Sequence, residues 1–260
     1  MTDTASPDAR TDIPVIRDIT TEDVFAALKA GLSDFQRAPL FGLFFGAVFS
    51  CFGVLMATLL FYGSAGYWVL PLTAGFPLIG PFAAIGLYEV SRRLKSGEPL
   101  SWGAVLSAGF TSRSGQLPFF AVVAVFFLLV WIVIARVVFA ITFGTASMTN
   151  VMTSIEVYTT FEGISMLLIG GVIGAALAGL LFSISVIGVP ILLDRDIDVV
   201  TAMITSFKAT VENRGPMILW AIIIAGATLI ASLPLFLGMV LIFPMLGHSA
   251  WHLYQAVIEP

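Results

Sequence analysis

Long apolar segments separated by short polar stretches dominate the pattern of this chain. A bilayer crossing needs roughly 20 consecutive apolar residues, and several segments reach that length. They run from Pro39 to about Tyr62, from Tyr67 to about Tyr88, from Pro118 to about Phe143, and from Ile164 to about Leu193. A last apolar segment, Pro216 to Val257, is twice the required length and has Pro234 near its middle, where a proline favours a turn between two spans. The pattern predicts an all-α, polytopic membrane bundle of about six transmembrane helices.

The composition excludes a soluble globular domain. Hydrophobic residues make up 58% of the chain and charged residues only 11%, whereas a soluble domain has about a quarter charged residues. The net charge of −4 argues against nucleic-acid binding, and Cys51, the only cysteine, has no partner within the chain for a disulfide. Most of the chain is therefore expected to have lipid as its solvent.

The N-terminus differs from the rest of the chain. Residues 1–20 are rich in Thr, Ser, Asp and Pro and lack the basic start and apolar core of a secretory signal. We interpret them as a disordered acidic tail that keeps the chain solvated, with docking of a partner as the alternative. Residues 21–260 then form a single transmembrane domain.

The positive charges predict the orientation. With six spans, eleven of the twelve basic residues fall on one side of the membrane, and the segment Gly144–Gly163 on the other side has no Lys or Arg. Cytoplasmic segments carry the excess of Lys and Arg. Both termini are therefore expected in the cytoplasm.

Three cytoplasmic segments look alike and suggest a threefold repeat, at about 21–95, 99–195 and 196–258. Each is expected to form an amphipathic surface helix of about four turns, capped by Thr20 with Asp23, by Ser101, and by Asp196 or Asp198. The apolar faces consist of Phe25, Leu28, Leu32 and Phe35 in the first; Trp102, Val105, Leu106, Gly109 and Phe110 in the second; and Val199, Val200, Met203, Ile204, Phe207 and Val211 in the third. Each segment ends with an arginine shortly before a proline that opens a span. The second span of each pair carries a glycine and proline interruption, at Gly80-Pro81, Gly188-Val189-Pro190 and Pro244 to Gly247.

His248 and His252 are the only histidines and lie four residues apart, so their rings share one face of the last span, beside Trp251 and Tyr254. Three interpretations remain open. The histidines hydrogen-bond neighbouring helices while the aromatic pair marks the membrane interface; they handle protons; or they bind a metal, which would need a further ligand. The acidic residues at the same depth that could supply it are Glu89, Asp194 and Asp196.

Two further polar features are candidates. In the run from Asp194 to Asp198, Arg195 is expected to pair with Asp194 or Glu89, with a polar gate or docking patch as the alternative. Arg136 lies inside the third span, where an arginine is costly unless it snorkels or pairs. Glu156 and Glu162 on the outer side are its candidate partners, and an anion path is the alternative.

Glycines four residues apart, at Gly42 and Gly46 and at Gly170 and Gly174, favour close packing of helices inside the bundle. Nucleotide-binding loops, metalloprotease and serine-hydrolase motifs are absent from the sequence. We therefore expect a non-catalytic protein without a cofactor.

Three segments resemble the signature sequences of a bacterial family of predicted integral membrane proteins known as domain of unknown function 2189. The first segment runs from Leu192 to Ala202, the second from Asn213 to Met217, and the third from Pro244 to Tyr254. The resemblance extends from about Val15 to Val257 and implies a multi-pass protein of the bacterial inner membrane, but no activity. We expect an accessory, scaffold or assembly factor whose partners are membrane lipids and another membrane protein complex. The alternative is a transporter or channel for a small solute or lipid, because helices broken by Gly and Pro mark substrate sites in transporters.

Overall fold

The computed structural model describes residues 14–62, 80–144 and 155–259, and these residues form an all-α protein, as expected. The helices are α1 (Thr21–Arg37), α2 (Pro39–Tyr62), α4 (Gly80–Ala83), α5 (Ile85–Ser96), α6 (Trp102–Ser107), α7 (Leu117–Phe143), the 3₁₀-helix η2 (Ile155–Thr159), α9 (Phe161–Ser185), α10 (Gly188–Asp194), α11 (Val199–Glu212), α12 (Arg214–Ser232) and α13 (Met239–Val257). Within the described ranges, extended pairing is limited to one isolated antiparallel bridge between Ile16 and Ile258.

Four helices in these ranges are long and apolar enough to cross a membrane: Pro39–Leu59, Leu117–Phe143, Phe161–Asp194 and Arg214–Ser232. They coincide with the first, third, fourth and fifth expected spans. The second expected span lies outside the described residues as far as residue 79. The sixth corresponds to α13, which is not among the four because its second half carries two histidines and a glutamine. Six spans and the threefold repeat therefore stay predictions, whereas a multi-pass membrane protein is shown.

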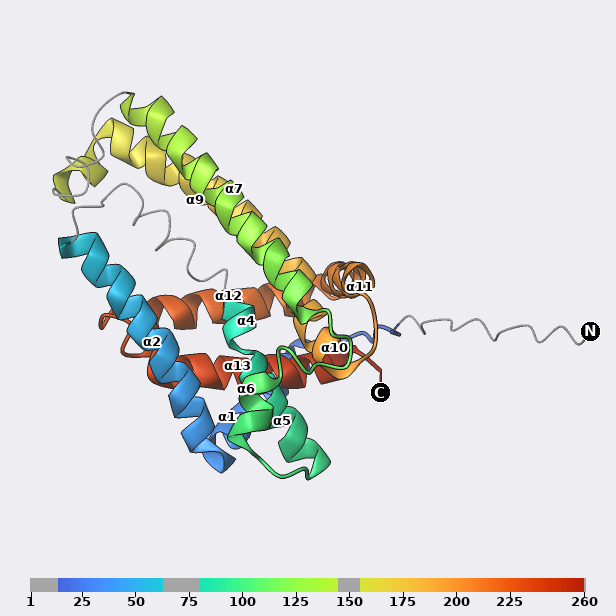
Figure 1. Ribbon diagram of the computed structural model, residues 1–260. Coiled ribbons are helices and arrows are strands. Elements are labelled where there is room, and N and C mark those ends of the chain that lie inside the picture. Colours follow the sequence, from blue (N-terminus) through green and yellow to red (C-terminus); the bar gives the residue numbers. More distant parts are fainter. Residues whose placement is uncertain (1–13, 63–79, 145–154, 260) are drawn as a thin grey trace, which may run out of the picture.

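The apolar segment with Pro234 at its centre folds into two helices, α12 and α13, as the proline suggested. The turn between them includes Leu235 and Phe236 in the left-handed backbone region, with φ of 50° and 63°. Gly238 lies so close to Ala231 of α12 that a Cβ there would stand 2.7 Å from the Ala231 Cα. The two helices consequently run antiparallel from a tight turn (Figure 1).

The core of the molecule surrounds α13, which packs antiparallel against α1 and α2. Glycines on the partner helices allow the close approach: Gly31 of α1 faces the Ser249 backbone, and Gly46 of α2 faces the backbone of Val240. The expected role of the Gly42 and Gly46 pair in helix packing is thereby confirmed. Trp251 and Leu253 of α13 are completely buried.

The α7 and α9 helices form a long pair that extends away from the end of the molecule where α10 and α11 lie (Figure 1). Gly174 of α9 faces the indole ring of Trp131, and a Cβ at this position would stand 3.0 Å from the ring. On α7, exposed apolar side chains recur every three or four residues, at Phe119, Val122, Phe126, Leu129, Val133 and Val137. This spacing places them on one helix face directed away from α9, as expected of a lipid-facing stripe.

The three surface helices have the expected caps but unequal lengths. Thr20 and Asp23 form the capping box of α1, and the Ser101 side chain accepts a hydrogen bond from the Ala104 N–H at the start of α6. Asp198, not Asp196, caps α11. The expectation of about four turns is wrong for α6, which has only six residues. A glycine and the polar run from Thr111 to Gly115 follow it and do not favour continued helix.

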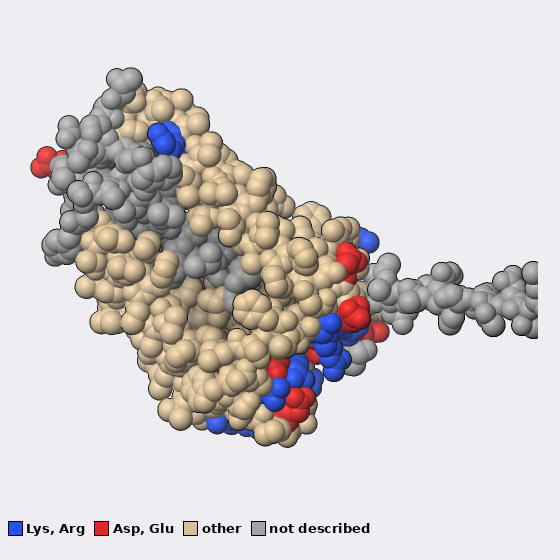
Figure 2. All heavy atoms as spheres, viewed as in Figure 1, with Lys and Arg blue, Asp and Glu red and all other residues tan. Residues whose placement is uncertain are grey.

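Charged side chains gather at one end of the molecule, around α5, α10 and the C-terminal end of α13 (Figure 2). The rest of the visible described face is almost free of charge, apart from single basic and acidic spots at the opposite tip. This distribution is the one expected of a chain whose middle lies in lipid and whose charged end lies in water.

Residues 14–20, which the sequence assigned to the disordered tail, are fixed against the rest of the chain. The Arg17 N–H donates to the Val257 carbonyl at 2.8 Å, and Asn213 bonds both the Ile19 N–H and the Arg17 carbonyl. The apolar side chain of Ile19 is buried, which the polar composition of the surrounding segment concealed. Residues 1–13 lie outside the described part of the chain.

Candidate functional site

The candidate site is formed where α13 crosses α1 and α5. His248 and His252 do share one face of α13, as their spacing predicted, but each contacts a different helix. His248 faces Ser91 of α5, and His252 faces Asp34 of α1. The site therefore connects three helices that are distant in the sequence.

Asp34 stands at the centre of this arrangement and is buried. His252 Nε2 lies 2.7 Å from Asp34 Oδ2, and the Arg37 guanidinium lies 3.7 Å from Oδ1. Burial alone would raise the pKa of Asp34, but hydrogen bonds with His252 and Ser91 more than offset it and hold the pKa below its ordinary value. The carboxylate is therefore ionised at neutral pH and accepts the hydrogen bond from His252.

Ser91 of α5 connects this carboxylate with the second histidine. Its hydroxyl contributes to the lowered pKa of Asp34. Ser91 Oγ also lies 2.8 Å from His248 Nδ1, and which of these two atoms donates depends on the tautomer of the ring.

His248 Nε2 is buried and has no hydrogen-bond partner in the described part of the chain. A buried polar atom without a partner costs about 1–3 kcal/mol. The completely buried His248 ring thus stands at the end of a polar row formed with Ser91, Asp34 and His252, in which Ser91 bonds His248 and Asp34 bonds His252.

The aromatic residues beside the histidines lie inside the protein. Trp251 and Tyr254 are buried, with ring centroids 5.2 Å apart, so the interpretation that they mark the membrane interface is wrong. The reason is that α13 is covered by α1, α2 and α5 along this face. The Tyr254 hydroxyl donates to Asp194 Oδ2 at 2.9 Å and joins α13 to α10.

The other charged candidates do not join the histidines. The expected pairing of Arg195 with Asp194 or Glu89 is replaced by a hydrogen bond from Arg195 to the Glu259 carbonyl. Glu89 is buried and instead bonds Arg92 and Arg93 of its own helix. Asp196 is exposed, on the connection between α10 and α11.

Arg136 lies within α7, remote in the fold from α13. Of its candidate partners, Glu156 lies in η2 and Glu162 lies in the first turn of α9. The pairing of Arg136 with either remains a prediction.

The described residues bring together no group of three or more His, Cys, Asp or Glu side chains that could hold a metal ion. His248 and His252 use one ring nitrogen each for Ser91 and Asp34. This arrangement favours the first of the three sequence interpretations, in which the histidines bond neighbouring helices. Proton handling by the two histidines stays a prediction.

Asp34, Ser91 and Asn213 were missed as site residues by the sequence interpretation. One signal was available for Asp34: residues 24, 27, 31 and 34 recur at helical spacing and form a stripe next to the apolar face of α1, with Ala27 and Gly31 as its small residues. Those four residues are the buried ones in the helix. Ser91 and Asn213 show no comparable signal, because their role depends on which helices meet.

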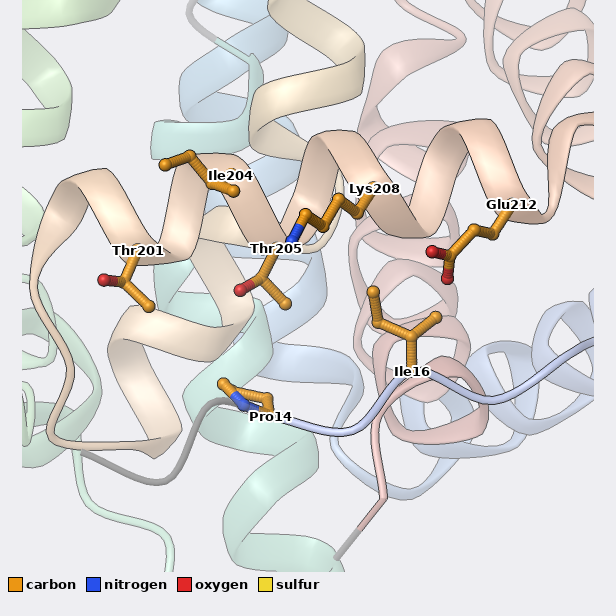
Figure 3. A pocket seen from close by; sticks show the side chains of 7 residues that line it. All are labelled: Pro14, Ile16, Thr201, Ile204, Thr205, Lys208 and Glu212. Atoms are coloured by element: carbon orange, nitrogen blue, oxygen red, sulfur yellow. The ribbon is translucent and has the colours of Figure 1, made fainter. Parts of the chain in front are cut away.

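A second feature at the charged end is a shallow pocket of about 370 Å³ between α11 and the N-terminal segment. Figure 3 shows Thr205 and Glu212 pointing from α11 toward the segment that carries Pro14 and Ile16. None of the sequence candidates lines it. The two candidate regions are thus separate.

The helices, the uncharged middle and the charged end define an all-α, multi-pass integral membrane protein. The family model described as predicted integral membrane protein, domain of unknown function 2189, matches residues 69–194, which confirms the resemblance expected from the sequence. The match is shorter than the expected extent from Val15 to Val257 and ends before the histidine motif. Neither the curated proteins nor the solved structures contain a match to the chain.

Proposed function

We propose that this protein is a non-catalytic accessory, scaffold or assembly factor that acts by binding another protein within the membrane. The observation that supports the proposal is how little of three of the four spans is covered by the rest of the chain. The most apolar segments of α2, α7 and α12 are 33%, 22% and 17% buried, whereas that of Phe161–Asp194 is 67% buried. Most of the surface of α2, α7 and α12 is therefore left for lipid or for a neighbouring protein.

The use of the polar residues supports the same proposal. His248, His252, Tyr254 and their partners hold α13 to α1, α5 and α10 and thus stabilise one end of the molecule. In an enzyme, such groups would converge on a pocket open to substrate. Here these polar groups form contacts between helices, which suits a rigid platform that presents apolar helices to a partner.

We place this platform in a bacterial inner membrane, with both termini in the cytoplasm. The support is the asymmetry of Lys and Arg along the chain together with the charged end of the fold. The family resemblance agrees with a membrane location.

The alternative, a transporter or channel, is favoured by the interruption between α9 and α10 at Val186 and Ile187. Broken helices in transporters expose backbone groups to a substrate. In this protein, however, the Ile187 N–H donates to Ser206 Oγ at 3.1 Å, and Ser206 Oγ donates to the Ser183 carbonyl at 2.8 Å. Because α11 already satisfies the broken backbone, we rank transport second.

Photo-crosslinking in intact membranes tests the proposal. A photoreactive residue replaces Leu129 on the exposed face of α7, Phe52 on α2 or Leu229 on α12, and Ala124, buried on α7, serves as the matched internal position. We expect a single protein adduct of defined mass from one exposed helix and none from position 124. The same adduct should appear as a stoichiometric complex in native mass spectrometry.

Lipid adducts alone from all three exposed helices, with a bare protein in the mass spectrum, would contradict the accessory function. An adduct only with a second copy of the chain would contradict it as well. After either result, flux measurements in proteoliposomes would test the transporter alternative.

A further inference from the structure

A second pocket at the charged end, of about 390 Å³, lies between α5, α6 and the connection that leads into α7. Its lining is formed by Glu89, Arg92, Arg93, Glu98, Ala104, Ser107, Ala108, Thr111, Ser112, Arg113 and Leu193. Three arginines against two glutamates leave one net positive charge, and hydroxyl groups supply further donors. The pocket therefore has the chemistry of an anion site.

The glutamates position two of the arginines. Buried Glu89 accepts from Arg92 Nε at 2.8 Å and from Arg93, so it holds both guanidinium groups at the pocket wall. Glu98 bonds the outer edge of Arg92 with two oxygens, at 2.8 Å and 3.0 Å. That two-pronged contact is the geometry in which a guanidinium also binds a phosphate group.

Two donors of the pocket are unused. Arg113 is exposed and makes no hydrogen bond or ion pair within the described part of the chain. The Ser112 hydroxyl oxygen is buried without a partner among those residues. Buried polar atoms are nearly always hydrogen-bonded, so the Ser112 hydroxyl indicates a partner outside the described residues, and a bound ligand would supply it.

The place of the pocket in the fold identifies the source of the anion. Three residues separate Arg113 from the start of α7, a membrane-spanning helix. Beside the pocket, Trp102, Leu106 and Phe110 are exposed, and Phe110 is 82% exposed. Apolar side chains of this size next to an arginine at the end of a span suit contact with acyl chains below a headgroup.

We propose that this pocket binds the phosphate group of an anionic phospholipid, with Arg113 and Ser112 as donors and Arg92 as a third contact once Glu98 is displaced. The lipid site is independent of whether the protein also acts through a protein partner. It makes the connection between α6 and α7 the point where the protein selects its surrounding lipid.

Lipid retention tests this site. The full chain is placed in nanodiscs of phosphatidylcholine with and without phosphatidylglycerol, released, and weighed with its retained lipid by native mass spectrometry. We expect Arg113→Gln to weaken retention of phosphatidylglycerol about tenfold, as for loss of one hydrogen bond to a charged group. The matched control is Arg214→Gln, which removes an exposed arginine at the start of another span, outside this pocket.

A second variant predicts the opposite change. Glu98→Gln removes the carboxylate that competes for Arg92, so phosphatidylglycerol retention should increase. Equal losses in Arg113→Gln and Arg214→Gln would show general charge attraction and overturn the site, as would no preference for phosphatidylglycerol over phosphatidylcholine. If inorganic phosphate in detergent raises the melting temperature of the parent chain and not of Arg113→Gln, while retention shows no lipid preference, the ligand is free phosphate and the lipid assignment is overturned.

Discussion

His252 of α13 and Asp34 of α1 are 218 residues apart in the sequence, yet His252 Nε2 lies 2.7 Å from Asp34 Oδ2. The contact fastens the last helix of the chain to the first. Both partners lie at the charged end, and Ser91, whose hydroxyl contributes to the lowered pKa of Asp34, contacts His248. Loss of the carboxylate would leave His252 without its acceptor.

Replacement of Asp34 by Asn should therefore destabilise the protein. We expect a loss of about 1–3 kcal/mol at neutral pH, because a buried hydrogen bond to a charged group is removed. The pKa of Asp34 is lowered in the folded protein, so its contribution is complete above the ordinary value of 3.8 and is lost as the pH falls through the lower, folded value. The Asn variant should show less of this loss in acid, measured as thermal unfolding in detergent across pH.

A double-mutant cycle with His252→Gln separates the pair from its surroundings. We expect a coupling energy of about 0.5–3 kcal/mol between positions 34 and 252, as found for residues in direct contact. Additive effects of the two replacements would show that the contact contributes no net stability.

Gly31 should tolerate no side chain. A Cβ at this position would stand 2.5 Å from the Ser249 backbone nitrogen and 2.7 Å from its Cα. The Ser249 backbone could relieve these contacts only by a shift of α13 that lowers the stability of the fold. Gly31→Ala should cost about 1–3 kcal/mol, the usual effect of overpacking. The matched control is Gly226→Ala in α12, where a Cβ meets nothing within 4 Å and should leave the melting temperature unchanged or slightly higher.

The sequence was most informative where lipid is the solvent. Four spans, the turn at Pro234 and the caps at Thr20, Ser101 and Asp198 follow from local patterns that need no knowledge of the fold. Hydrophobic length and capping chemistry act within a few residues, and a single sequence records them directly.

The candidate site was only half predictable. The spacing of His248 and His252 gave their common face, but their partners Ser91 and Asp34 depend on which helices pack on α13. The same limitation applies to Trp251 and Tyr254: their residue types suggested the membrane interface, whereas packing of α1, α2 and α5 buries them. Aromatic residues occur both at the membrane interface and in buried cores, and only the tertiary contacts distinguish the two locations.

Ser206 should be required for the broken helix between α9 and α10. Ser206→Ala leaves the Ile187 N–H buried without an acceptor, which should cost about 1–3 kcal/mol. Ser232→Ala is the matched control, because among the described residues Ser232 Oγ bonds only the Thr228 carbonyl of its own helix. Thermal unfolding of both variants in the same detergent measures the difference, and equal stabilities would show that Ser206 does not support the break.

Asn213 should hold the N-terminal segment against the body of the protein. Its side chain accepts from the Ile19 N–H at 2.7 Å and donates to the Arg17 carbonyl at 3.1 Å, in a buried position between α11 and α12. Asn213→Ala removes both bonds at once, so residues 14–19 should lose protection in hydrogen exchange by about tenfold or more, since each bond contributes about 0.5–1.5 kcal/mol. The bond from the Arg17 N–H to the Val257 carbonyl involves only backbone and is kept, so the segment should loosen without the helices unfolding. Unchanged exchange at the Ile19 amide would show that backbone pairing with the C-terminus is sufficient to hold the segment.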